Sequence, residues 1–180
     1  MALHRQKDKS VEVKSAAELE IMRRAGRILR EMREALVEMV RPGISTWELD
    51  QEFARMAREC EVISAFHGLY GFPGNICASI NEEVVHGIPS KERILRSGDI
   101  VSLDMGIILD GFYSDTAVTA AVGEIDADTR RLLEATKQSL DDGIELCIPG
   151  NRLGDLGNRI QRCVEKQGFA VVRDYTGHGI

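Results

Sequence analysis

The stretch Ile100-Val-Ser-Leu-Asp-Met-Gly-Ile-Ile-Leu-Asp-Gly-Phe-Tyr-Ser-Asp-Thr116 decides how this chain folds. Two β-rich runs flank Asp110-Gly111, the preferred dipeptide of a two-residue type I′ hairpin, because both turn residues must adopt positive φ. A turn at this point places Gly106 opposite Asp115. Since side chains alternate between the faces of a strand, Asp104 and Asp115 are then diagonal neighbours on one face, roughly 7–8 Å apart at the backbone.

The two faces of this hairpin differ in chemistry. One is apolar, as expected of a sheet packed on helices, and carries Val101, Leu103, Met105, Ile107, Leu109 and Phe112. The other carries both aspartates, and Gly106 is expected to leave open space there for an ion or a substrate. Two ionised carboxylates on a half-buried face repel each other, and divalent cations remove that penalty. The simpler interpretation is one solvated aspartate and one that caps a turn.

Two of the four histidines favour the metal hypothesis. His86 ends an apolar run and precedes Gly87, while His178 lies between two glycines, which permit close approach of the backbone to a ligand. A lone histidine is more often a hydrogen-bonded structural residue. We interpret His4 and His67 in that structural sense.

Helices are expected on both sides of the β-rich region. Ser15-Ala-Ala-Glu18 and Ser45-Thr-Trp-Glu48 are capping boxes, so a helix begins at each. Apolar residues follow at helical spacing, and Pro42-Gly43 ends the first run. Further along the chain we expect one helix from Asp128 to about Cys147, another to about Gln167, and a strand over 169–172.

The helical regions indicate an internal repeat. Pro42-Gly43 corresponds to Pro149-Gly150 within the same order of helix, turn and helix. We therefore predict an N-terminal extension over 1–14 and a single domain over 15–180, with halves of about 15–123 and 124–180. Ile180 corresponds to Pro73, so the second half lacks counterparts of residues 74–123.

Composition excludes several classes of protein. A chain of 180 residues with 43% apolar and 29% charged residues suits one soluble domain. A net charge of −6 argues against a protein that binds nucleic-acid phosphates. Residues 1–14 lack the apolar run of a signal sequence or membrane span, so we expect a cytoplasmic protein. The four cysteines form no CxxC pair, which favours reduced thiols.

Four segments together resemble type I methionine aminopeptidases of the short bacterial form. They are residues 79–89, 98–106, 110–116 and 177–180. The resemblance covers nearly all of residues 15–180 and implies the pita-bread α+β fold, in which two pseudo-symmetric halves give strands to a central antiparallel sheet flanked by helices. It also implies a monomeric enzyme that removes the N-terminal methionine of nascent polypeptides near the ribosome.

The resemblance implies roles for individual residues. Asp104 binds one metal ion, Asp115 bridges two, and His178 binds the other. His86 is a hydrogen-bonding catalytic residue beside the scissile peptide, and the carbonyl after the methionine is attacked by a metal-bound hydroxide. Oxygen and imidazole ligands suit Mn²⁺, Fe²⁺, Co²⁺ or Zn²⁺ and do not choose among them.

A methionine pocket is implied by the same resemblance. Its walls correspond to Phe66, Leu69, Phe72 and Cys77. Aromatic and sulfur-containing walls suit an unbranched thioether, which is flexible and polarizable. The pocket stretch favours a methionine aminopeptidase over a proline-specific peptidase of the same fold, which stays open as an alternative.

Family members continue beyond the Gly-His-Gly segment and supply a later histidine and two glutamate ligands. A chain with three of five protein ligands is expected to be C-terminally truncated and inactive. A non-catalytic binding module of the same fold is therefore the second alternative. The presence of His86, Asp104, Asp115 and His178 argues against that alternative.

Overall fold

The computed structural model describes residues 13–180, so the extension predicted over 1–14 lies almost wholly outside the described residues. Its elements in chain order are α1 (Ala16–Met39), α2 (Thr46–Glu59), β1 (Ile63–Ser64), the 3₁₀ turn η1 (Leu69–Gly71), β2 (Ile76–Ile80), β3 (Ile100–Leu109), β4 (Phe112–Ala121), α3 (Ala127–Ile144) and α4 (Leu153–Lys166). Within these residues no helix is long and apolar enough to cross a membrane.

Both capping boxes form as predicted. The Ser15 hydroxyl accepts the Glu18 amide at 3.3 Å, while the Glu18 carboxylate accepts the Ser15 amide at 2.7 Å. Ser45 and Glu48 repeat this exchange at 3.2 and 2.8 Å. Each exchange satisfies two amides that the first turn of a helix leaves unpaired. The starts of α1 and α2 are therefore determined by four-residue signals.

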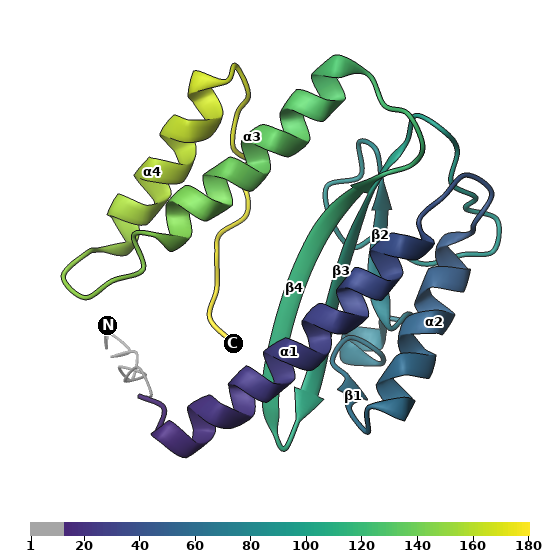
Figure 1. Ribbon diagram of the computed structural model, residues 1–180, viewed down its shortest axis with the longest axis horizontal. Coiled ribbons are helices and arrows are strands. Elements are labelled where there is room, and N and C mark those ends of the chain that lie inside the picture. Colours follow the sequence, from purple (N-terminus) through teal and green to yellow (C-terminus); the bar gives the residue numbers. More distant parts are fainter. Residues whose placement is uncertain (1–12) are drawn as a thin grey trace, which may run out of the picture.

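The predicted hairpin is confirmed. Asp110 and Gly111 adopt φ of 50° and 83°, as a type I′ turn requires. β3 pairs with β4 along its whole length, with Gly106 opposite Asp115. The other edge of β3 pairs antiparallel with β2 and, further along, with β1. β3 is therefore the central strand of the sheet (Figure 1).

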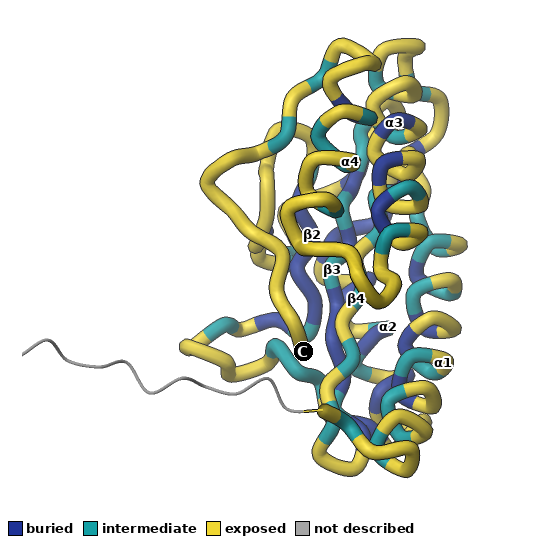
Figure 2. The backbone as a smooth tube through the Cα atoms, turned by 90° about the vertical axis from the view of Figure 1, so that its left-hand side faces the viewer, coloured by how far each residue is buried: buried dark blue, intermediate teal, exposed yellow. Residues whose placement is uncertain are grey.

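The sheet separates a packed face from a polar face. α1 and α2 cover one face and bury its alternating apolar residues, including Val101, Leu103, Met105 and Ile107, against Leu29, Leu36 and Phe53. Figure 2 shows these helices on one side of the strands and the returning C-terminal segment on the other. α3 and α4 pack on each other as a helical hairpin. Asp104 and Asp115 therefore lie on the face opposite α1 and α2, on the side to which the C-terminal segment returns.

Two predicted details are wrong. Asp126, rather than Asp128, caps α3, because its extended backbone lets the carboxylate accept the Thr129 amide at 2.8 Å. The stretch 169–172 is no strand in the described structure. Its first residue, Phe169, instead donates its amide to the Val164 carbonyl at 3.2 Å and lies under the Arg131 guanidinium. Phe169 is thus hydrogen-bonded to the end of α4 and does not begin a strand.

Candidate metal centre

Asp104 lies at the middle of the polar face of the sheet. It is paired with Cys77 on β2 and with Ala117 on β4, and it is half-buried. Burial, together with the smaller effect of the nearby Asp115 charge, raises the pKa of Asp104 to about 6. Electrostatic interactions with His86 and His178 lower the pKa of the same carboxyl group. Four residues that are distant in the sequence therefore interact electrostatically at one place.

Cys77 forms the buried floor beside these carboxylates. Its side chain is only 5% exposed. Burial raises the pKa of the Cys77 thiol to about 12, and the charges of Asp104 and Asp115 contribute in the same direction. The thiol is therefore neutral at physiological pH and acts as a small apolar surface.

The space above Gly106 is filled, so the expected opening for an ion there is wrong. A Cβ atom on Gly106 would lie 3.0 Å from Cε1 of Phe66 and 3.1 Å from Cβ of Ala65. The chain leaving β1 continues alongside β3 at this point, and the Ala65 amide donates to the Gly106 carbonyl at 2.9 Å. Gly106 thus admits the Phe66 ring to the face that carries Asp104 and Asp115.

The turn that carries His86 is pressed against β2. A Cβ atom on Gly87 would lie 2.3 Å from the Ala78 carbonyl oxygen, so only glycine fits. The Gly87 carbonyl accepts the Ala78 amide at 2.8 Å, and the Gly87 amide donates to the Ser79 hydroxyl at 3.0 Å. His86 itself has a positive φ of 61°. The exposed imidazole is therefore held next to the strand that carries Cys77.

His178 belongs to the C-terminal segment, which runs back from α4 toward the sheet (Figure 1). Its side chain is exposed, and Nδ1 lies 3.1 Å from the carbonyl oxygen of Gly179. His178 lowers the pKa of Asp104 electrostatically, so its imidazole lies within electrostatic reach of the acidic centre, the name used here for Asp104 and Asp115.

The residues at this centre suit a divalent cation by their chemistry. Asp104 is half-buried and Asp115 is exposed, and their proximity disfavours the negative charge of Asp104, a penalty that a cation removes. Carboxylate and imidazole donors suit first-row divalent metals. Between Val13 and Ile180, however, no group of three or more His, Cys, Asp or Glu side chains already stands close enough to hold an ion. Asp104 and Asp115 thus share one face of the sheet, but the described residues do not form a complete coordination shell.

The predicted pocket residues fall into two sets. Phe66 and Cys77 lie at the acidic centre, as described above. Leu69 begins η1 and is 51% exposed, and Phe72 is partly buried at the end of the same loop. The loop is closed by hydrogen bonds of 2.9 Å from the Gly68 amide to the Phe72 carbonyl and from the Phe72 amide to the Leu69 carbonyl.

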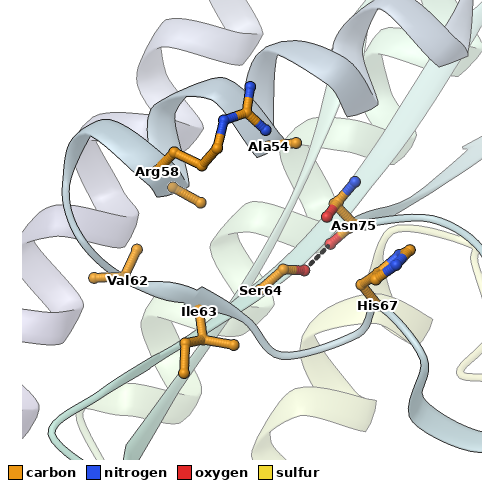
Figure 3. A pocket seen from close by; sticks show the side chains of 8 residues that line it. Ala54, Arg58, Val62, Ile63, Ser64, His67 and Asn75 are labelled. Atoms are coloured by element: carbon orange, nitrogen blue, oxygen red, sulfur yellow. Dashed lines mark hydrogen bonds between the residues drawn. The ribbon is translucent and has the colours of Figure 1, made fainter.

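A separate pocket of about 250 Å³ lies between α2 and β1 (Figure 3). It is lined by Ala54, Ala57, Arg58, Val62, Ile63, Ser64, His67 and Asn75, and so contains none of the predicted pocket walls. Nδ1 of His67 lies 3.1 Å from the Pro73 carbonyl oxygen. This contact agrees with the structural role expected of His67.

Asp50, which no sequence motif singled out, is only 3% exposed. It accepts the Ile76 amide at 3.2 Å and the Asn75 side-chain amide at 3.0 Å, and it also accepts the Asn75 backbone amide. Asp50 therefore anchors the start of β2 to α2, directly before Cys77. The available signal was an acidic residue between Leu49 and Phe53 on the apolar stripe of a helix.

Comparison with known proteins agrees with this arrangement. Residues 20–180 match metallopeptidase family M24. A methionine aminopeptidase of Clostridium acetobutylicum is 46% identical over 168 residues, which cover 93% of this chain and 67% of that protein. The crystal structure of the Thermotoga maritima methionine aminopeptidase superposes with a TM-score of 0.92 at 39% identity, covering 94% of this chain and 68% of that one.

A Bacillus anthracis Xaa-Pro dipeptidase shares the fold with a TM-score of 0.75 at 23% identity, covering 92% of this chain and 44% of that one. The chain spans about two thirds of the length of its methionine aminopeptidase relatives. Its α+β architecture is the pita-bread fold of these enzymes. The chain therefore belongs to metallopeptidase family M24, as a metalloexopeptidase of the methionine aminopeptidase group.

Proposed function

We propose that this protein removes the N-terminal methionine from nascent polypeptides, using two divalent ions held by Asp104, Asp115 and His178. The observation that carries the proposal is the shared face of Asp104 and Asp115, with two imidazoles acting on the same carboxyl group. We assign the ions to the group Mn²⁺, Fe²⁺, Co²⁺ and Zn²⁺. Bound there, such ions would supply Lewis-acid chemistry that polarises the scissile carbonyl and activates water.

The chain's own side chains would bind and orient the substrate. His86 has an exposed imidazole that acts electrostatically on Asp104, and in this proposal it forms a hydrogen bond to the scissile peptide. Phe66 and Cys77 supply an apolar surface against which a thioether can pack, with Leu69 and Phe72 on the adjoining loop. A neutral Cys77 thiol suits this role, because a charged thiolate would compete for the metal ions.

We infer that the 180-residue polypeptide by itself holds ions weakly and turns over no substrate, because its described residues assemble no three-residue metal cluster. The same proposal includes a division into halves of about 15–123 and 124–180. It also includes a cytoplasmic location, action near the ribosome and a monomeric state. The high identity to methionine aminopeptidases favours methionine over proline specificity.

The test uses the full-length protein with the variant Asp115→Asn. Release of methionine from Met-Ala-Ser should require added Mn²⁺ or Co²⁺, and the variant should lose both activity and bound metal. Asp110→Asn is the matched control, because it makes the same chemical change in a turn that tolerates asparagine. Normal turnover and metal content in Asp115→Asn would contradict the assignment.

A further inference from the structure

The turn over residues 81–88 adopts a strained backbone. Asn81 and His86 have φ of 55° and 61°, a region that residues other than glycine seldom occupy. Val84, Val85 and Ile88 are exposed, so little apolar packing holds the turn in place. Conformations of this kind persist where surrounding contacts determine them. We therefore expect the position of the His86 imidazole to depend on the contacts that the turn makes on each side of His86.

Arg93 contacts this turn on both sides of His86. Its Nη1 donates to the Ile88 carbonyl at 2.9 Å, and its Nη2 forms an ion pair with the Glu83 carboxylate. Glu83 also accepts the Ile80 amide at 2.8 Å, at the end of β2. The planar Arg93 guanidinium thus connects Glu83, three residues before His86, to Ile88, two residues after it.

Arg93 is itself fixed to the core of the protein. Its carbonyl accepts the Thr46 amide at 2.9 Å, at the first residue of α2. Thr46 is fully buried, and its hydroxyl accepts the Ser90 amide at 3.0 Å and donates to the Ser90 carbonyl at 3.2 Å. The arginine backbone is therefore anchored to a helix start, while its side chain is only 24% exposed.

We propose that Arg93 is a positioning residue for His86, acting through Glu83 and the Ile88 carbonyl. The inference rests on the proposed catalytic role of His86. Because Arg93 contacts the turn and not the reacting atoms, its loss should misplace the imidazole without changing the pocket that binds the methionine side chain. Small misplacements of a catalytic group lower the rate of the chemical step far more than they weaken binding.

Kinetics of the full-length enzyme test the proposal. Arg93→Met is expected to lower kcat for Met-Ala-Ser by about tenfold or more and to change KM by less than about twofold. Arg93→Lys, which keeps the charge next to Glu83, should recover part of the loss. The double variant Glu83→Gln/Arg93→Met should be no slower than Arg93→Met, because both changes break the same connection.

Arg55→Met is the matched control, because Arg55 also pairs with two partners, Glu52 and Glu59, but lies on α2. It should leave kcat unchanged. An equal loss of kcat in this control, or a normal kcat in Arg93→Met, would overturn the proposal.

A second measurement separates this inference from the proposed function. NMR spectra of the metal-free protein should show shifted or broadened imidazole and amide signals of His86 in Arg93→Met, with His67 unchanged. If the wild-type protein and His86→Ala have equal kcat, the catalytic role of His86 fails, whatever the spectra show. Unchanged His86 signals in Arg93→Met would show that Arg93 does not position this turn.

Discussion

Cys77 of β2 lies directly opposite Asp104 of β3, so a buried thiol and a half-buried carboxylate share the polar face of the sheet. Each group is disfavoured in its charged form by burial and by nearby negative charge. This arrangement makes the metal-free centre electrostatically unfavourable at neutral pH. A bound cation would instead stabilise the negatively charged form of Asp104.

Asp104 should make the stability of the metal-free protein depend on pH. Its folded-state pKa of about 6 lies above the ordinary value of 3.8. The stability gained through its protonated form is therefore fully present below about pH 3.8 and is lost as pH rises through about 6. Asp104→Asn should melt above the wild type at pH 7, and the gap should shrink toward pH 4. Thermal melts in chelator measure the gap, and a gap independent of pH would contradict the prediction.

Cys77 should be the slowest cysteine to react with iodoacetamide. The reactive form is the thiolate, which burial and two neighbouring carboxylates suppress in Cys77, whereas Cys60 and Cys147 are exposed. Mass spectrometry of the folded protein should find Cys60 and Cys147 modified first. In denaturant the difference should vanish. Modification of Cys77 at the rate of Cys60 in the folded protein would show that the floor of the centre is open.

Gly87→Ala should destabilise the protein and displace His86, because the added carbon meets the Ala78 carbonyl. Forced overpacking of this kind costs about 1–3 kcal/mol. Gly157→Ala is the matched control, since Gly157 lies within α4 with open space around the position of its Cβ. Alanine there should be neutral or stabilise by about 0.5–1 kcal/mol. Urea melts measure both, and equal stability of the two variants would refute the close approach at Gly87.

Asp50→Ala should cost more stability than any exposed aspartate variant. It leaves the buried Ile76 amide and the partly buried Asn75 amide without their acceptor. Each buried donor left unsatisfied costs about 1–3 kcal/mol. Asp50→Asn keeps one acceptor oxygen and should cost less. Asp128→Ala, at an exposed position in the first turn of α3, is the control and should fall within about 0.5 kcal/mol of wild type. A similar loss in Asp50→Ala and Asp128→Ala would contradict this anchoring role.

The sequence alone determined the features whose physical cause lies within a few residues. Asp110-Gly111 sets the hairpin and its register, because positive φ at both positions permits only one pairing of β3 with β4. Ser15 with Glu18, and Ser45 with Glu48, set two helix starts through hydrogen bonds that span one turn. Asp128 was the exception, since Asp126 competes for the same role two residues earlier.

Tertiary structure decided the features in which distant segments meet. Phe66 fills the space above Gly106, Asp50 ties α2 to β2, and Arg93 holds the turn of His86. None of these contacts follows from a local pattern, because each depends on which element packs next to the residue. Backbone preferences and cap hydrogen bonds are short-range, whereas burial and the approach of two charged groups are set only when the chain has packed.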